Sequence, residues 1–133
     1  MSRPSIEVFH PRNLGKRSWG SETLIAETDQ YLGKLLKMHK GHAGGLQYHR
    51  VKVESFHLFY GKARVDYDKD GKLVSLMMTP GMTVHVPAGA PHRVLALEDS
   101  MFFEVSTPVF DDRVRVETEY GEPDTGGLPT TGS

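Results

Sequence analysis

The chain has 133 residues, with 16 basic and 17 acidic side chains and a formal net charge of −1. This length suits one domain with one hydrophobic core. The charges are interspersed and form no basic stripe, so nucleic acid is not an expected partner. The absence of cysteine excludes disulfides, zinc–thiolate sites and thiol nucleophiles. Because neither a signal-peptide core nor a membrane-length apolar run is found, we expect a soluble cytoplasmic protein without membrane contact.

The 14 glycines and 8 prolines are spread between short apolar runs, which is typical of an all-β sandwich or barrel. Gly61 predicts a bend between two strands, and Asp70-Gly71 predicts a tight hairpin turn. We predict one barrel domain over residues 1–121 and a flexible tail over 122–133. In chain order, strands are predicted over residues 22–28, 31–38, 54–60, 62–67, 73–78, 82–86, 93–97, 101–107 and 113–119, with a turn-rich stretch at 13–20 before them.

The segment 5–9 is a short apolar alternation that precedes the barrel. As a strand it would need an edge to pair with, and pairing with a second chain would bury that edge and enlarge a small core. The sequence therefore predicts a homodimer.

Three side chains with metal-ligating groups, Gln47, His49 and Glu54, fall within eight residues. Residues 47 and 49 share one strand face, whereas Glu54 has the opposite parity and joins them only if the strand is interrupted. A fourth ligand has to come from elsewhere, and His92 is the natural candidate because a rigid Pro-Ala-Gly-Ala-Pro turn precedes it. Imidazole nitrogens, an amide oxygen and a carboxylate favour one divalent transition metal, Zn, Mn, Fe, Co or Ni. Four protein ligands leave two positions of an octahedral ion open.

The segments 44–61 and 81–92 resemble the first and second cupin motifs. The matching positions are Gln47, His49, Glu54 and Gly61 in the first motif, and Gly81, Pro87, Gly89 and His92 in the second. Gln47 stands where many cupins have histidine, and Ala96 stands where the second motif often ends in asparagine. The resemblance implies an all-β, single-domain cupin fold, a double-stranded β-helix or jelly-roll barrel, with these four residues as metal ligands.

Within the cupins, residues 15–121 resemble the C-terminal isomerase domain of type II phosphomannose isomerase/mannose-1-phosphate guanylyltransferase. The likeness rests on Leu46-Gln47 entering the first motif, on the segment 17–21 (RSWGS) and on the closing segment 112–121. It implies metal-dependent aldose–ketose isomerisation of a sugar or sugar phosphate through an enediol. Lys52 stands where the family has the arginine that holds the sugar phosphate, and lysine lacks the bidentate fork.

A substrate of this kind needs cations and a general base near the ion. We predict Arg17, Lys34, Lys52 and Arg93 as substrate-binding residues. Because Glu54 would be occupied by the metal, the base would be Lys34, His57 or metal-bound hydroxide. Two other functions stay open: an iron- or manganese-dependent oxygenase or decarboxylase, and a non-catalytic sugar-binding module.

Overall fold

The structure is a computed structural model that describes residues 3–123. It consists of β-strands and one short 3₁₀ helix, η1, with no α-helix in the described residues. The elements are β1 (Arg12–Arg17), β2 (Gly20–Glu27), β3 (Leu32–Met38), β4 (Gln47–His49), β5 (Glu54–Tyr60), β6 (Ala63–Lys69), β7 (Lys72–Met78), β8 (Thr83–Val86), β9 (His92–Ala96), β10 (Ser100–Ser106), β11 (Arg113–Arg115) and η1 (Glu117–Tyr120).

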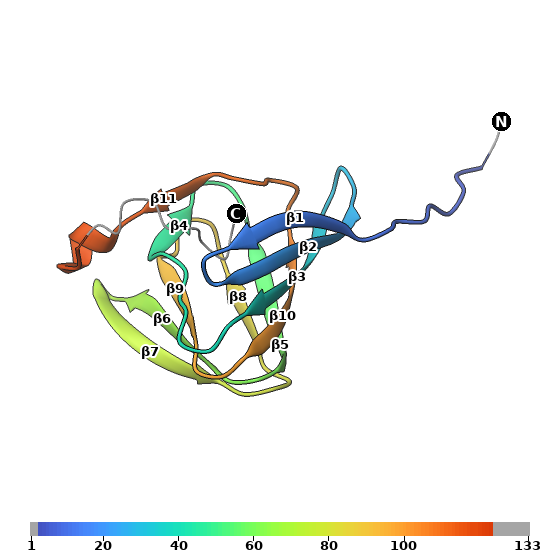
Figure 1. Cartoon of the computed structure of the whole chain (residues 1–133). Helices are drawn as coiled ribbons and strands as arrows, with labels where there is room; N and C mark the ends of the chain where they lie inside the picture. The colour runs from blue at the N-terminus through green and yellow to red at the C-terminus, as the bar shows by residue number, and fades with distance from the viewer. Residues whose placement is uncertain (1–2, 124–133) are drawn as a thin grey trace.

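The strands form two antiparallel sheets that curl toward each other into a barrel (Figure 1). The six-stranded sheet has the order β1-β2-β3-β10-β5-β8, and the five-stranded sheet has the order β11-β4-β9-β6-β7. The chain passes from one sheet to the other several times, as in a jelly roll, so strands far apart in sequence become neighbours. The predicted all-β barrel is confirmed.

The core lies between the two sheets and is built from alternate residues of each strand. Phe56 of β5 and Phe102 of β10 pack edge-to-face there, with ring centroids 5.9 Å apart. Trp19 is fully buried in the same cluster. Because burial of one large apolar side chain contributes about 1.5–3 kcal/mol, this cluster supplies much of the stability of a small barrel.

Two turns follow from local sequence. Asp70 and Gly71 both have positive φ, 55° and 84°, as a two-residue hairpin between β6 and β7 requires. Gly61 has φ of 99°, and a Cβ there would lie 2.2 Å from Ser100 Oγ. Only glycine fits this close approach, where β10 also shifts its register against β5. Both predictions, the hairpin turn and the bend, are confirmed.

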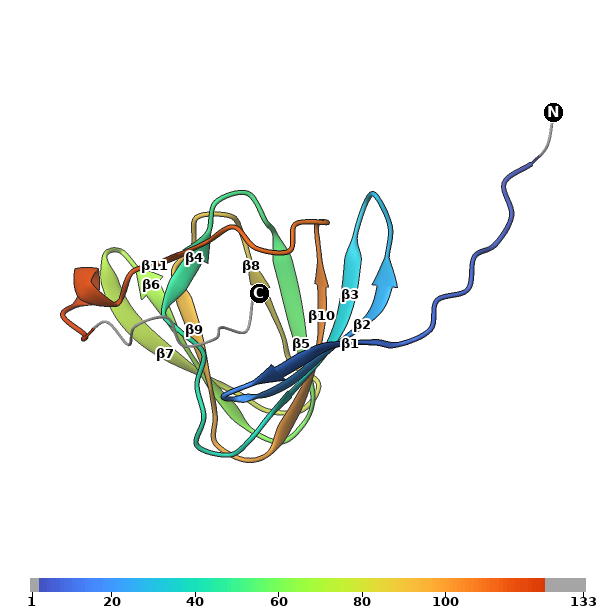
Figure 2. The ribbon, with the colours of Figure 1, turned by 45° about the horizontal axis from the view of Figure 1, so that its top comes forward.

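The structure differs from the expected strands in three places. The stretch 13–20 was expected to be a turn, but β1 occupies most of it and pairs with β2. The last strand is shorter than 113–119, because Glu117 begins η1 and its carboxylate accepts the backbone N–H of Leu46. The segment 5–9 lies outside every strand, in an extended arm that leaves the barrel (Figure 2).

The predicted tail lies almost wholly outside the described residues, which end at residue 123. Between residues 3 and 123 no helix has the length and apolar character needed to cross a membrane.

Candidate metal centre

The four predicted ligands lie on three strands of the barrel. Gln47 and His49 are the two ends of β4, and His92 begins β9 and pairs with Gln47. Glu54 begins β5, which belongs to the other sheet. The chain therefore crosses between sheets over residues 50–53. This crossing is the interruption that the opposite parity of Glu54 required, and it turns the carboxylate toward the two imidazoles.

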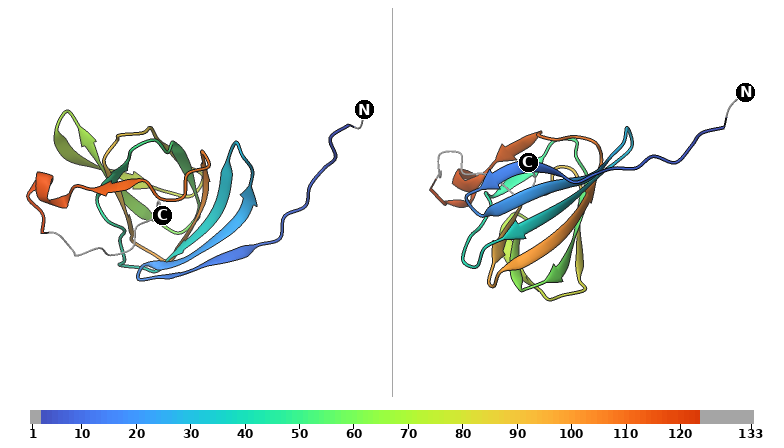
Figure 3. Two further views of the ribbon diagram at one scale, coloured as in Figure 1. Left: turned by 90° about the horizontal axis from the view of Figure 1, so that it is seen from above. Right: turned by 45° about the vertical axis from the view of Figure 1, so that its right-hand side comes forward.

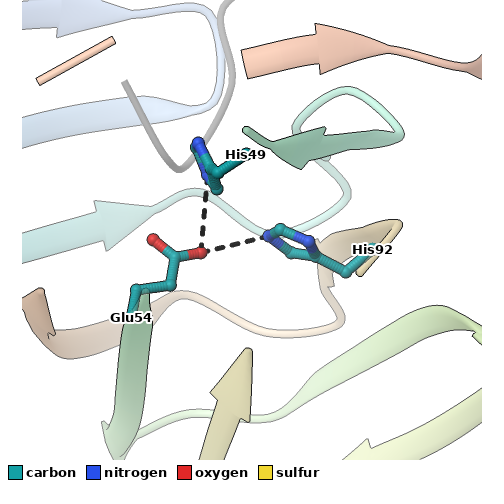
Figure 4. Close-up of side chains that lie close together, drawn as sticks. All are labelled: His49, Glu54 and His92. Atoms are coloured by element: carbon teal, nitrogen blue, oxygen red, sulfur yellow. Dashed lines mark hydrogen bonds and ion pairs between the residues drawn. The ribbon is translucent and has the colours of Figure 1, made fainter. Parts of the chain in front are cut away.

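The ligand atoms of His49, Glu54 and His92 converge within the barrel (Figure 4). Glu54 Oε1 lies 3.1 Å from His92 Nε2 and 3.7 Å from His49 Nε2. Two ligands that lie about 2.1 Å from an ion, at right angles to one another, are separated by about 3 Å. All four ligand residues are almost fully buried. The cluster therefore has the dimensions of a metal site before any rearrangement.

Hydrogen bonds at the back of each ring fix the imidazole tautomers. His49 Nδ1 lies 2.9 Å from Asp112 Oδ1, and His92 Nδ1 lies 3.0 Å from the carbonyl oxygen of Ala90. Both oxygens are acceptors, so each Nδ1 carries the hydrogen and, in a neutral ring, each Nε2 presents a lone pair to the cluster. Such a donor bond to a carboxylate or carbonyl is the usual support of a metal-ligating histidine.

Asp112 also shapes the crossing between the sheets. Its Oδ2 accepts the backbone N–H of Val51 at 2.7 Å and of Lys52 at 2.8 Å. Partial burial would raise the pKa of Asp112, but these two backbone bonds and His49 outweigh it and lower the pKa. One carboxylate thus holds the loop before Glu54 and orients His49.

Several buried atoms of the cluster lack the partners that their chemistry demands. Among the residues that the structure describes, neither polar atom of the Gln47 amide has a hydrogen-bond partner, nor does His49 Nε2. Buried polar groups are rarely left in this state, because each costs about 1–3 kcal/mol. In addition, His92 Nε2 lies 3.1 Å from Glu54 Oε1. A divalent cation would take up the lone pairs of the Gln47 amide oxygen and of His49 Nε2, although not the N–H groups of the Gln47 amide, so these oxygen and nitrogen donors fit the metal that the sequence predicts.

The protonation states suit a cation. Burial would raise the pKa of Glu54, but the hydrogen bond from His92 and the charge of Lys52 outweigh it, and the pKa lies well below its usual range. Burial lowers the pKa of His49, against the opposing effect of Glu54. At neutral pH the cluster therefore offers an ionised carboxylate and an imidazole with a free lone pair.

A ladder of buried charges runs from the ligand cluster across the six-stranded sheet. Lys52 Nζ lies 3.3 Å from Glu54 Oε2 and 3.2 Å from Glu104 Oε2. Lys34 Nζ lies 4.0 Å from Glu104 Oε2 and 2.9 Å from Glu22 Oε1. All five side chains are at most 2% exposed. Isolated buried charges are costly, and each lysine of the ladder lies between two carboxyl groups that offset this cost.

Glu104 is the member of this ladder that holds a proton most readily. Burial and the negative charge of Glu54 raise its pKa to about 8, although Lys52 and Lys34 act in the opposite direction. Neither Glu104 nor Glu22 is among the residues predicted from the sequence. The alternation of side chains along β10 could have indicated Glu104, because it lies on the same inward face as Phe102 and Ser106.

The predicted substrate-binding residues and bases separate into two groups. Lys34 and Lys52 lie inside the barrel, in the ladder, and Arg17 pairs with Glu22 Oε2 at 3.1 Å at its outer end. His57 and Arg93 are not brought to the ligands. His57 faces outward from β5, where its Nδ1 contacts Thr83 Oγ1 at 2.9 Å.

Arg93 directly follows His92 in β9 and points to the opposite side of the sheet. There its guanidinium pairs with Asp66 at 2.9 Å and with Glu122. Strand parity thus explains the placement of both His57 and Arg93.

A cavity of about 210 Å³ borders His92. Its wall is mainly apolar and includes Val65, Leu76, Val84 and Val86. Its polar members are Tyr67, Asp68, His85 and His92. Because this cavity touches a predicted ligand, it is the candidate space for a small substrate.

Comparisons with protein-family models and with curated proteins give no match. Solved structures do match. CapF, a capsular polysaccharide assembling protein from Staphylococcus aureus, aligns with a TM-score of 0.71 and 18% identity over 81% of this chain and 32% of CapF. KdgF from Halomonas sp. aligns with a TM-score of 0.67 and 21% identity over 81% of this chain and 98% of KdgF. Bacillus subtilis oxalate decarboxylase aligns with a TM-score of 0.71 and 18% identity over 86% of this chain and 34% of that protein.

The chain thus spans about a third of the length of CapF and of oxalate decarboxylase, and nearly all of KdgF. At these identities the likeness concerns the fold. Together with the two curled antiparallel sheets and the single hydrophobic core, it shows that the chain has the all-β fold of a single-domain cupin.

Proposed function

We propose that the chain is a metal-dependent enzyme that transfers a proton between adjacent carbons of a sugar, in the manner of an aldose–ketose isomerase. The observation that carries this proposal is the buried ligand set Gln47, His49, Glu54 and His92, in which the amide of Gln47 has no other partner among the described residues. Four protein ligands around a six-coordinate ion keep two positions for neighbouring substrate oxygens. The ion, when bound, supplies Lewis-acid stabilisation of negative charge on those oxygens.

The chain's own residues prepare the site for such a reaction. Asp112 and the carbonyl of Ala90 hold the two imidazoles in place. Lys52 holds one oxygen of Glu54, and it also pairs with Glu104. Glu104 therefore replaces His57 as the candidate for proton transfer, because it is inside the barrel and one ion pair away from the ligand cluster.

The buried ladder favours an uncharged sugar over a sugar phosphate. Lys34 and Lys52 were expected to help bind a sugar or sugar phosphate, but each has carboxylate partners and neither is exposed. A phosphate would have to displace those carboxylates inside the barrel, at a large cost in desolvation. The fold shared with a capsular polysaccharide assembling protein and the resemblance to the isomerase domain support a sugar as the first candidate.

One observation favours a second candidate function, a manganese- or iron-dependent oxygenase or decarboxylase. The cavity beside His92 has few polar side chains, whereas a sugar pocket needs many hydrogen-bond partners. The Bacillus subtilis oxalate decarboxylase that shares this fold has Mn(II) centres. A small substrate with an apolar part would fill the cavity better than a hexose.

The deciding experiment is a substrate panel with defined metals. Purified protein is stripped of metal, reloaded with Zn, Mn or Fe(II), and offered aldoses, ketoses, their phosphates, and small carboxylic acids, with and without oxygen. Solvent deuterium incorporated at the carbon beside a sugar carbonyl, without an oxygen requirement, would support isomerisation. Oxygen consumption or carbon dioxide release with a carboxylic acid, and no exchange in any sugar, would favour the second candidate. Ligand binding without turnover would contradict both.

A further inference from the structure

Tyr67 lies beside the predicted ligand His92 inside the barrel. It belongs to β6, and its registered partner on β9 is His92, which pairs in turn with Gln47 of β4. Residues that pair directly across antiparallel strands project to the same face of the sheet. Tyr67, His92 and Gln47 therefore form a row of three side chains that faces the barrel interior, with His92 in the middle. The Tyr67 side chain is half-buried in this position.

The cavity of about 210 Å³ beside His92 lies where the two sheets end. Its lining comes from β6 and β9 and also from β7 and β8, which are the last strands of the five-stranded and the six-stranded sheet. In the described part of the chain β7 and β8 do not pair with one another. In the left view of Figure 3 the hairpin of β6 and β7, drawn in yellow-green, lies on the side of the barrel away from the extended N-terminal arm. The cavity thus lies between a predicted metal ligand and two unpaired strand edges.

The polar side chains that line this cavity differ in their hydrogen bonding. Asp68 accepts a hydrogen bond from the hydroxyl of Tyr120, and His85 Nδ1 lies 3.0 Å from Ser55 Oγ. None of the hydrogen bonds found among the described residues includes the hydroxyl of Tyr67. A phenol hydroxyl can both donate and accept. The Tyr67 hydroxyl is therefore available to an oxygen atom of a molecule that enters the cavity.

The rest of the wall offers contact and no hydrogen bonds. The side chains of Val65 and Val86 belong to the buried core, and Leu76 and Val84 pack against it. No lysine or arginine of the described residues lines the cavity, so it has no cation for a phosphate or a carboxylate. A hydroxyl group pressed against this wall would lose water without gaining a partner, whereas a methyl group would be buried favourably.

We propose that this cavity binds the deoxygenated end of a deoxy sugar, and that Tyr67 donates a hydrogen bond to the nearest hydroxyl group that the sugar retains. The role of the cavity rests on the proposed function, because the ion beside His92 would hold the other end of the sugar. The apolar wall selects a carbon that lacks its oxygen, and Tyr67 fixes the orientation of the ring. A sugar of this class accounts for the apolar lining that otherwise favours a small substrate of another kind.

Matched pairs of sugars test the apolar wall. L-fucose and L-galactose differ only by the oxygen at C6, and so do L-rhamnose and L-mannose. Titration calorimetry with the Mn-loaded full chain measures the affinity for each sugar. In at least one pair the 6-deoxy sugar should bind about 10–100-fold more tightly, as expected when an apolar pocket discriminates against an added hydroxyl. Val84→Thr, which adds a hydroxyl to the wall at nearly constant volume, should reduce this preference.

Tyr67→Phe tests the hydrogen bond, because it removes the hydroxyl and keeps the ring. It should weaken binding of the preferred sugar about three- to tenfold, the usual effect of losing one uncharged hydrogen bond. The matched control is Tyr48→Phe. Tyr48 lies between Gln47 and His49 in β4 and projects to the other side of the sheet, so this variant should bind the sugar as the wild type does. Elemental analysis should find the same metal content in both variants.

The outcomes separate the cavity from the proposed function. Equal binding within both pairs of sugars, tighter binding of the hydroxylated members, or unchanged affinity in Tyr67→Phe overturns the role of the cavity and leaves metal-dependent sugar binding in place. If none of the four sugars binds, or if only a small carboxylic acid does, the proposed function and the role of the cavity are both wrong.

Discussion

Lys52 Nζ lies 3.3 Å from Glu54 Oε2, while Glu54 Oε1 faces the imidazoles of His49 and His92. The two oxygens of one carboxylate thus have different partners. The lysine takes one oxygen, and the other is left for the ligand cluster. Glu54 Oε1 is thus the carboxylate oxygen that would be available to hold a metal, while Lys52 holds Oε2.

Substitution of Lys52 by methionine should destabilise the metal-free protein by about 3–5 kcal/mol, the usual cost of removing one partner of a buried ion pair. Glu54 and Glu104 would then share the barrel interior without the cation between them. The free energy of unfolding in urea measures the loss. Adding Glu104→Gln to Lys52→Met should recover part of it at pH values above about 8, where Glu104 would otherwise ionise beside Glu54. The control Lys62→Met, on an exposed side chain, should change stability by less than about 0.5 kcal/mol. An equally small change in stability for Lys52→Met would contradict a stabilising role for the contacts of Lys52 with Glu54 and Glu104.

The metal content of the protein should fall when the proposed ligands are substituted and should not change when outward-facing histidines are substituted. Elemental analysis of wild-type protein should find about one equivalent of a transition metal. His49→Ala with His92→Ala should abolish it. The matched control is His57→Ala with His85→Ala, which removes two imidazoles that contact Thr83 and Ser55 on the outer faces of β8 and β5. If the control loses metal as well, or the ligand variant keeps it, the assignment is wrong.

Asp112→Asn should weaken metal binding by about 10–100-fold, as expected when the group behind a ligating histidine is changed. An amide cannot accept hydrogen bonds from both His49 and the backbone N–H groups of Val51 and Lys52 as the carboxylate does. Competition with a chelator measures the affinity. Asp111→Asn alters the neighbouring, exposed carboxylate, so equal losses in the two variants would argue against a role for the His49 contact.

The metal-free protein should lose stability as the pH rises from 6.5 to 8. The folded-state pKa of Glu104, about 8, is above its unfolded value near 4.5, so the folded state holds a proton that the unfolded state releases. The stabilising contribution is complete below the unfolded pKa and is lost as the pH approaches 8. Over 1.5 pH units the expected loss is about 1–2 kcal/mol. Unfolding in urea at several pH values measures it, and Glu104→Gln should flatten the profile.

Below pH 6.5 His49 acts in the opposite direction. Its pKa is lowered in the folded state, so the unfolded chain takes up a proton there and stability falls with falling pH. A profile that rises between pH 6.5 and 8 in the wild type would contradict the placement of Glu104.

The sequence predicted which residues the fold brings together at the candidate site better than it predicted their surroundings. The spacing around His49 and His92 pointed to the cluster in which the ligand atoms of His49, Glu54 and His92 lie close together, and alternation was enough to find most strands. The ladder could not be found in this way, because Glu104 lies 50 residues from Glu54 and joins it only when β5 and β10 pair. His57 and Arg93 were chosen for their chemistry, whereas strand parity turns both of them away from the ligands. Asp112 was predicted as part of a closing segment, and only the folded chain shows that it contacts His49.

The crossing of the chain between His49 and Glu54 has a mechanical consequence. Three of the four ligands belong to the five-stranded sheet and one belongs to the six-stranded sheet, so a bound ion would tie the two halves of the barrel together. Metal occupancy would then govern how often the halves separate, and with it the slowest amide hydrogen exchange in β4 and β9. In this way the same ion that is proposed to bind substrate would also hold the two sheets of the barrel together.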